Sequence, residues 1–444
     1  MKKTDSKKFI FITFVHSLRI MILNIKKISA NPIVRNILLL FSGTGLSQLV
    51  PFVATLFLSR LYSQTDFGDL ALVMSIAGII ATVAALRYDL IIILQKTVSK
   101  AKTAMSLCFS LIALICFLTI IFLFLFKSTL VRSLDISYYG LLYSIPLIAG
   151  GTGIYSVFEN WFNSRREYKN MAYIKIAQSS TNAIAKLALG FAGISWGLIG
   201  GTVIGSFIMI FVCLYLLSKK ETFSLQYFSY KKMKQLAVSY QDFAKYATPS
   251  GLLNSLALMG LPVLITYFYS TDTTGVYFFA ATLIGMPIFF LSNATAQVFK
   301  KEAAVLVQQN KWQELNDLVR KFQRTIFFII FAFILVFSLF GADIFSFLFG
   351  NRWYESGQLI KFFAFYALIS ACYTIISSLA DILRLLKAEL IFNAALLVSQ
   401  MTVFFVCSNY LTFEYTLLIN SIVGCFLYLS LDRYVKNKIK IKFL

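Results

Sequence analysis

The chain has 444 residues, of which 59% are hydrophobic and only 14% are charged, and its formal net charge is +22. A soluble globular domain carries a much larger share of charged residues, so the composition excludes that class. Apolar runs long enough to cross a bilayer recur along most of the sequence. The composition therefore predicts an all-α integral membrane protein.

Twelve apolar runs are predicted to be transmembrane helices, since each can cross the hydrocarbon core of a bilayer. They cover 36 to 60, 68 to 94, 104 to 126, 138 to 161, 171 to 191, 194 to 217, 243 to 269, 275 to 299, 325 to 349, 358 to 383, 389 to 408 and 411 to 431. The expected organisation is an N-terminal segment (1 to 35), a first half (36 to 217), a basic linker (218 to 242), a second half (243 to 431) and a basic tail (432 to 444).

Lysine and arginine gather in alternate loops of this span map. The basic segments are 96 to 102, 165 to 169, 219 to 234, 300 to 324, 384 to 387 and 433 to 442. The positive-inside rule then places both termini and the basic loops in the cytoplasm. The net charge is thus interpreted as a topology signal, with anionic lipid headgroups rather than nucleic acid as its partner.

A short internal repeat divides the chain into two halves. The first copy contains Tyr62, Ser63 and Gly68, and the second contains Tyr269, Ser270 and Gly275. Each copy follows a helix with an internal proline, Pro51 or Pro262, and the copies end the first and seventh spans. Because six is even, the halves keep one orientation in the membrane, which predicts a pseudo-two-fold axis along its normal. Transporters are commonly built this way.

Polar side chains at helical spacing mark the face of a membrane helix that avoids lipid, because an unpaired polar group in hydrocarbon costs free energy. Lys175, Gln178, Asn182 and Lys186 form such a stripe in the fifth span. Weaker stripes occur in the first span (Thr44, Gln48 and Thr55), the seventh (Ser250 and Asn254) and the eighth (Asn293 and Gln297). We expect these faces to line a hydrated central cavity, although close helix packing explains the first and seventh spans equally well.

Four cations lie in or beside the predicted spans: Arg87, Lys175, Lys186 and Lys245. Few deep acids oppose them, so the cavity is expected to attract an anionic group such as phosphate or carboxylate. Two of the cations also have structural interpretations, because Arg87 can partly snorkel and Lys175 can pair with Glu159.

Four acids are candidates for coupling transport to a cation, H+ or Na+: Asp89, Glu159, Asp242 and Asp381. Each lies near the end of a span, where a solvated or paired carboxylate is the simpler interpretation.

Motifs typical of enzymes are absent from the sequence. It has no Gly-Lys-Ser/Thr phosphate loop, no His/Cys metal cluster and no Gly-x-Ser-x-Gly elbow, and it contains one histidine. We therefore expect a protein that is not an enzyme and that holds no cofactor and no metal.

Several motifs resemble the N-terminal region of polysaccharide repeat-unit flippases. They are Ser42 to Gly45, Gln48, Pro51, Ser59 to Tyr62, Asp66 to Gly68 and the run Leu86, Arg87, Tyr88 and Asp89. The family comprises the Wzx-type translocases of O-antigen and capsule synthesis, in the multidrug/oligosaccharidyl-lipid/polysaccharide superfamily. The resemblance covers about residues 33 to 95 in motifs, and beyond them it depends on span count, topology and the repeat.

This resemblance implies two six-helix lobes in a V shape, with spans one, two, seven and eight around the cavity. It implies transfer of an undecaprenyl-diphosphate-linked oligosaccharide across the bacterial cytoplasmic membrane by ion-driven alternating access, together with polymerase and chain-length partners. By motif position Arg87 is the carried-over cation, whereas Ala294 occupies the matching place in the second half, so a symmetric arginine clamp is not expected. The alternatives are a cation-coupled drug exporter of the same superfamily and a membrane glycan polymerase.

Overall fold

The computed structural model describes residues 50–134, 139–219, 225–383 and 385–441, and the elements in these ranges are helices. The first part contains a Val50–Leu61 helix, α3 (Gln64–Ala84), η1 (Tyr88–Ile92), α4 (Val98–Leu125), α5 (Lys127–Leu134), η2 (Tyr139–Tyr143), α6 (Ser144–Ser164), α7 (Tyr168–Phe191) and α8 (Gly197–Ser218). The second contains η3 (Leu225–Phe228), α9 (Tyr230–Ser239), η4 (Phe243–Ala247), α10 (Thr248–Met259), α11 (Leu261–Phe268), α12 (Thr271–Gln308), α13 (Trp312–Phe349), η5 (Asn351–Trp353), α14 (Tyr354–Ile382), α15 (Leu386–Cys407) and α16 (Phe413–Ile441).

Each predicted span overlaps a helix of the structure, which confirms a helical protein with many membrane spans. In the described ranges, nine helices are long and apolar enough to cross a bilayer, or ten if Phe243–Met259 and Leu261–Phe268, bent by 51°, form one broken span. The other two predicted spans are α7, which carries the polar stripe, and the short Val50–Leu61 helix. A total of twelve spans stays a prediction.

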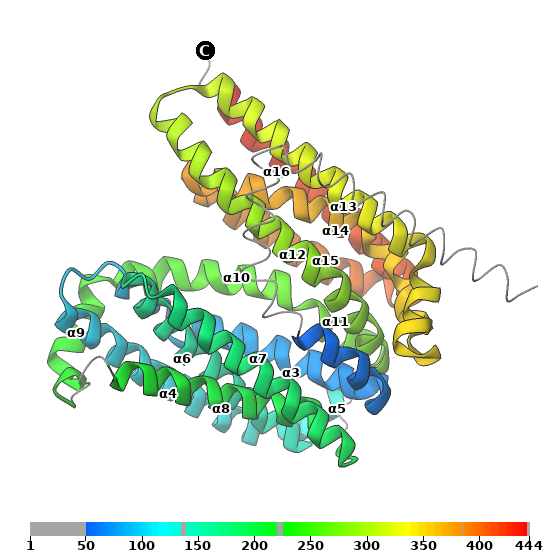
Figure 1. The fold of residues 1–444 in the computed structure, drawn as a ribbon, viewed down its shortest axis with the longest axis horizontal. Coiled ribbons are helices and arrows are strands. Elements are labelled where there is room, and N and C mark those ends of the chain that lie inside the picture. Colours follow the sequence, from blue (N-terminus) through cyan, green and yellow to red (C-terminus); the bar gives the residue numbers. More distant parts are fainter. Residues whose placement is uncertain (1–49, 135–138, 220–224, 384, 442–444) are drawn as a thin grey trace, which may run out of the picture.

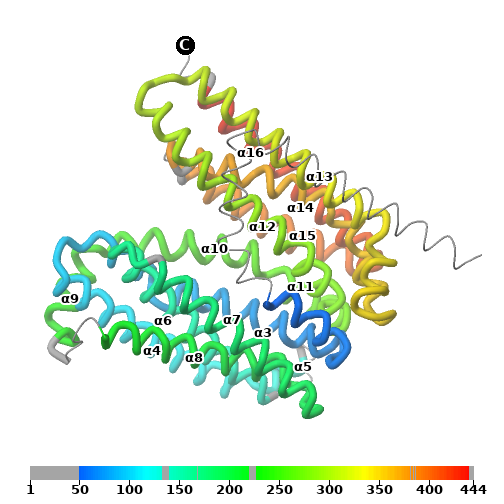
Figure 2. Tube along the Cα trace, in the orientation of Figure 1, coloured from blue at the N-terminus to red at the C-terminus, as the bar shows by residue number. Residues whose placement is uncertain are grey.

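Two helical bundles meet at one end and diverge toward the other (Figures 1 and 2). The first bundle contains α3 to α8, the second contains α12 to α16, and α10 lies between them in contact with both α3 and α15. We call the diverging side, on the left of Figure 1, the basic end, because it carries α9, which contains Lys231, Lys232 and Lys234, and the turn between α12 and α13, which contains Lys311.

The bundles meet at the closed end, formed by residues 59–68, 271–279 and 350–353. Here α3 and α12 each begin at a serine of the sequence repeat. The Ser63 hydroxyl accepts from the Asp66 amide at 3.1 Å, and the Ser270 hydroxyl accepts from the Thr273 amide at 3.0 Å. A serine N-cap satisfies a backbone donor that the helix itself cannot satisfy. The repeat therefore encodes two equivalent helix starts.

The two copies of the repeat also contact each other, and they do so reciprocally. A Cβ on Gly68 would lie 1.9 Å from the Thr271 carbonyl oxygen, and a Cβ on Gly275 would lie 1.8 Å from that of Gln64. Thr65 donates to Asp272 at 3.3 Å, and these two residues are 207 positions apart, which is the repeat offset. Contacts i to j and j to i are what a local two-fold axis produces. Only glycine permits this close approach of α3 and α12.

An aromatic cluster fills the closed end. Trp353 is fully buried, its ring stacks on Phe279 at 3.8 Å between centroids, and it meets Phe67 edge-on at 5.0 Å. The indole nitrogen donates to the Ser59 carbonyl oxygen at 2.9 Å. Because Trp353 and Phe279 belong to the second half of the chain while Phe67 and Ser59 belong to the first, this cluster joins the two halves.

Two hydrogen bonds from side chains to backbone carbonyl oxygens reinforce the same junction. The Arg352 guanidinium donates to the Tyr62 carbonyl oxygen at 3.2 Å, and the Gln64 amide donates to the Arg352 carbonyl oxygen at 2.7 Å. Burial, together with the Asp66 carboxylate, raises the pKa of Tyr62 to about 12. The Tyr62 hydroxyl therefore stays a donor, and it bonds to the Lys186 carbonyl oxygen of α7 at 2.8 Å.

One predicted helix is wrong in its extent. The span expected over 68 to 94 ends at Ala84, and the chain turns through Leu86 and Arg87, whose φ angles are +46° and +58°, before the short η1. No glycine or proline marks this turn, and left-handed backbone is uncommon for such residues. The turn is maintained by contacts that its side chains make with three other elements.

Candidate functional site

Three consecutive residues at the turn after α3 reach in different directions. Arg87 packs against α10, where a Cβ on Gly251 would lie 3.6 Å from its Nε atom. The Tyr88 hydroxyl donates to the Ala237 carbonyl oxygen of α9 at 3.1 Å, and Asp89 contacts α6. The Leu-Arg-Tyr-Asp motif therefore connects α10, the linker helix α9 and α6 at one point.

Arg87 is the cation whose surroundings best suit an anion. Its side chain is half-buried, and its Nε atom is buried without a hydrogen-bond partner in the part of the chain that the structure describes. A buried donor without a partner costs free energy, which makes Arg87 a candidate for binding an anion. Arg87 lies where α3 of the first half faces α10 of the second.

The contact between α3 and α10 continues away from Arg87. The Ser255 hydroxyl donates to the Thr82 hydroxyl at 2.7 Å, one helical turn further along α10 than Gly251. Two predicted cavity residues are on α10, of which Ser250 is half-buried and Asn254 is exposed. The second and seventh predicted spans are thus adjacent, as the resemblance implies.

Asp89 is a buried carboxylate, 6% exposed, whose Oδ2 atom accepts two hydrogen bonds from α6. The donors are the Ser156 hydroxyl at 2.7 Å and the Asn160 amide at 3.2 Å. These bonds hold the Asp89 carboxylate against α6. The structure therefore gives Asp89 a fixed environment inside the first bundle.

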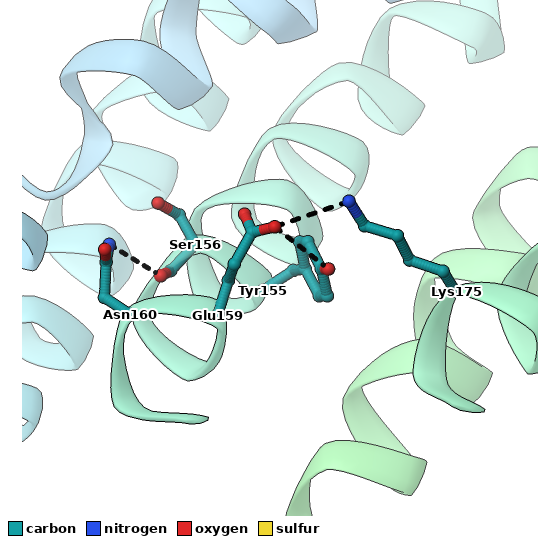
Figure 3. Close-up of polar contacts among 5 residues, drawn as sticks. All are labelled: Tyr155, Ser156, Glu159, Asn160 and Lys175. Carbon is teal, nitrogen blue, oxygen red and sulfur yellow. Dashed lines mark hydrogen bonds and ion pairs between the residues drawn. The ribbon is translucent and has the colours of Figure 1, made fainter. Parts of the chain in front are cut away.

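Glu159 and Lys175 form the ion pair that the sequence predicts. Their Oε1 and Nζ atoms are 3.3 Å apart, and the Tyr155 hydroxyl donates to the same carboxylate oxygen at 3.4 Å. Figure 3 shows Glu159 and Tyr155 turned toward Lys175, while Ser156 and Asn160 lie on the side of α6 away from it. This pairing is confirmed, and it compensates the charge of Lys175 and of Glu159.

The polar stripe of α7 lies along its seam with α8. A Cβ on Gly201 would lie 2.5 Å from Lys186 Cγ, and one on Gly205 would lie 2.9 Å from Asn182 Cβ and 3.4 Å from the Gln178 carbonyl oxygen. Glycines four residues apart let two membrane helices approach closely. The spacing of Gly197, Gly201 and Gly205 signals this seam in the sequence, and the seam differs from the hydrated cavity that we expected the stripe to line.

The remaining candidates make local contacts or lie outside the described residues. Lys245 donates to Gln241 at 2.7 Å, Asn293 to the Phe289 carbonyl at 2.8 Å and Thr55 to the Pro51 carbonyl at 2.8 Å. Asp242 and Gln297 are exposed. Thr44, Gln48 and the Asp381 side chain lie outside the described part of the chain. Among the described residues no group of three or more His, Cys, Asp and Glu could hold a metal ion.

Sequence reasoning missed the residues that join the halves at the closed end. Trp353 and Arg352 follow Gly350 in a loop assigned to the side with few charges, and neither was singled out for a role there. A tryptophan next to an arginine in an otherwise short, weakly charged loop is the available signal.

The family of the chain follows from its sequence. The model for polysaccharide biosynthesis proteins matches residues 57–358, a region that includes Arg87 and the whole closed end. The chain belongs to the polysaccharide biosynthesis protein family. Among curated protein sequences, none matches it.

Solved structures share the fold of this family member. The inward-facing conformation of a multidrug resistance MATE family transporter of the MOP superfamily has a TM-score of 0.72 at 15% identity, over 89% of this chain and 95% of that chain. The lipid II flippase MurJ, in an inward closed conformation, has a TM-score of 0.70 at 13% identity, over 88% of this chain and 87% of that chain. The outward-facing conformation of a multidrug resistance MATE family transporter has a TM-score of 0.52 at 15% identity, over 92% of this chain and 96% of that chain. The resemblance to flippases of the MOP superfamily is confirmed in family and fold.

Proposed function

We propose that this family member is a flippase for an undecaprenyl-diphosphate-linked oligosaccharide repeat unit, used in O-antigen, capsule or exopolysaccharide synthesis. The observation that carries the proposal is Arg87, a half-buried cation with an unused donor at the contact between the two halves, in a polysaccharide biosynthesis protein. A guanidinium suits a diphosphate because it offers several donors in a fixed plane.

The conformation supports alternating access. The two bundles are joined at the closed end and diverge at the basic end (Figure 1), and the TM-score falls from 0.72 for an inward-facing relative to 0.52 for an outward-facing one. If the basic end is cytoplasmic, this is the state that receives substrate from the inner leaflet. The reciprocal contacts of Gly68 and Gly275 support two lobes related by a two-fold axis, which the opposite state would preserve.

The four predicted cations differ in whether another residue already binds their charge. Lys175 is compensated by Glu159, and Lys245 is exposed and bonded to Gln241. Arg87 is therefore our choice for the diphosphate, with Lys186 as a second cation inside the first bundle. Asp89 is our choice for a coupling H+ or Na+, because it is a buried carboxylate two residues from Arg87.

Substitution of Arg87 tests the proposal. In a deletion strain complemented with Arg87→Gln, surface polysaccharide should fall at least about tenfold while protein level in the membrane is unchanged, since one charged hydrogen bond contributes about 1.5–3 kcal/mol. Arg87→Lys should retain part of the activity. The matched control is Arg132→Gln, an exposed arginine of α5, which should behave as wild type. Normal polysaccharide from Arg87→Gln would remove this residue from the mechanism.

A cation-coupled drug exporter is the second candidate, favoured by the TM-score of 0.72 to a multidrug transporter. The deletion strain separates the two. A flippase predicts accumulation of lipid-linked oligosaccharide and unchanged drug sensitivity, whereas an exporter predicts drug sensitivity and normal polysaccharide.

A further inference from the structure

The second bundle contains a pocket of about 330 Å³ that is distant in sequence from the Arg87 motif. It lies between α13, α14 and α16. Its lining residues are Gln323, Arg324, Phe327, Ile369, Cys372, Tyr373, Tyr428, Leu429, Asp432 and Lys436. Small-molecule sites begin at about this volume, so the pocket has room for part of a lipid chain.

The polar residues of the pocket leave one positive charge free. Asp432 accepts from Gln323 at 2.8 Å through Oδ1 and from Lys436 at 2.7 Å through Oδ2, so both carboxylate oxygens are occupied. The positive charge of Lys436 is thereby compensated by Asp432. Arg324 is exposed, and among the described residues it has neither an ion-pair nor a hydrogen-bond partner. The rim of the pocket therefore has an uncompensated guanidinium.

The rest of the pocket is apolar and opens at the surface of the bundle. Tyr428 is buried at 5% exposure, whereas the neighbouring Leu429 is 54% exposed. Phe327 and Ile369 supply further apolar wall from α13 and α14. A ligand that fits these surroundings is an amphiphile, because an entirely polar molecule would lose hydrogen bonds to water along this wall.

The charged rim and the apolar wall of the pocket lie at different depths in the membrane, according to the positions of their residues in the predicted spans. Arg324 directly precedes the predicted span 325 to 349, and Asp432 directly follows the span 411 to 431. Cys372 and Tyr373 lie within the span 358 to 383. The charged rim is therefore at the membrane boundary on the basic end, and the apolar wall is within hydrocarbon, which matches the headgroup and chain of a lipid.

We propose that this pocket binds one anionic phospholipid. Its phosphate contacts Arg324 and one acyl chain lies along Phe327 and Cys372. The site is separate from the transport path through Arg87, so the proposal does not depend on the flippase function. Phosphate is recognised well by a guanidinium, and anionic headgroups are attracted to basic membrane-proximal positions.

The test is native mass spectrometry of the purified full-length chain after incubation with either phosphatidylglycerol or phosphatidylcholine. Wild type should retain one phosphatidylglycerol, and Arg324→Gln should lower this retention at least about fivefold. Arg320→Gln is the matched control, because Arg320 is exposed on α13 one turn earlier and does not line the pocket. Cys372→Phe should lower retention of both lipids by filling the wall while leaving the charges in place.

Three results would overturn the proposal. The first is equal retention of phosphatidylglycerol by wild type and Arg324→Gln. The second is an equal loss of retention in Arg320→Gln, which would show a general effect of charge. The third is displacement of phosphatidylglycerol by an equal concentration of undecaprenyl phosphate, which would assign the pocket to an isoprenoid. Because Arg324 is exposed, its variant should fold, and thermal unfolding in detergent checks this.

Discussion

The closed end and the basic end connect the same two bundles by different kinds of contact. At the closed end, glycine backbones touch and Trp353 is fully buried against both halves. Toward the basic end, α3 meets α10 through side chains, the Ser255 to Thr82 hydrogen bond and the approach of Arg87 to Gly251. Beyond these contacts the bundles separate (Figure 1).

Under the proposed alternating access, this difference indicates where free energy is needed. A rocking movement that opens the closed end must expose the aromatic cluster and separate Gly68 from Thr271. The contacts near Arg87 are made by side chains and include one hydrogen bond between two hydroxyls. We therefore expect substitutions at the closed end to alter stability and the balance of conformations, and substitutions near Arg87 to alter substrate binding.

The largest stability effect is expected from Trp353→Ala. Removing a fully buried tryptophan leaves a cavity beside Phe279 and removes the hydrogen bond to Ser59, so the free energy of unfolding should fall by about 3–5 kcal/mol. Unfolding of the detergent-solubilised protein measures this. Trp196→Ala is the control, because Trp196 is 45% exposed and its loss should cost much less. Equal losses would contradict a specific role for the closed end.

Gly275→Ala should come next. The added methyl group would overlap the Gln64 carbonyl oxygen and push α12 away from α3, at a cost of about 1–3 kcal/mol. Gly285→Ala changes the same helix where a Cβ meets no atom within 4 Å, so it should be neutral or slightly stabilising. Thermal unfolding of the two variants compares them directly, and equal melting temperatures would refute the close crossing.

Loss of the Ser255 to Thr82 hydrogen bond should have a smaller effect. Ser255→Ala is expected to cost about 0.5–1.5 kcal/mol, because a single neutral hydrogen bond is removed from the contact between α3 and α10. A double-mutant cycle with Thr82→Val isolates the pair. A coupling energy as large as that between Trp353 and Phe279 would contradict the difference between the two regions.

The smallest effect is expected for the Glu159 and Lys175 ion pair. Their side chains are 38% and 51% exposed, so their coupling should be about 0–1 kcal/mol by double-mutant cycle. Lys175→Met should also leave surface polysaccharide near normal, because the pair is interpreted as structural. Loss of polysaccharide at normal protein level would return Lys175 to the substrate path.

The sequence predicted the helices well because long apolar runs separated by basic loops leave few alternatives in a bilayer. The repeat likewise identified Ser63 and Ser270 as equivalent positions, and in the structure each is the N-cap of a helix. It did not show that the two copies contact each other, since equivalence in sequence carries no information about distance. The structure shows that contact in the close approach at Gly68 and Gly275 and in the Thr65 to Asp272 hydrogen bond.

The site was predicted less completely. The Glu159 and Lys175 pair was found because opposite charges at the same depth of neighbouring spans are informative. Arg87 was placed inside a continuous helix, since no turn residue marks Leu86, and the turn depends on contacts with α6, α9 and α10 that are remote in sequence. The α7 stripe shows a related difficulty, because polar residues facing glycines of α8 have the same spacing as residues facing water.

The claim that the closed end must open in each cycle is tested most directly by locking it. Thr65 and Asp272 are hydrogen-bonded to each other across the junction at 3.3 Å, so a Thr65→Cys/Asp272→Cys variant can be joined by oxidation or a short dithiol-reactive linker. We predict that the cross-linked protein fails to translocate lipid-linked oligosaccharide in proteoliposomes, that reduction of the disulfide restores transport, and that each single variant is unaffected by oxidant. Undiminished transport by the fully cross-linked protein would contradict alternating access through this end.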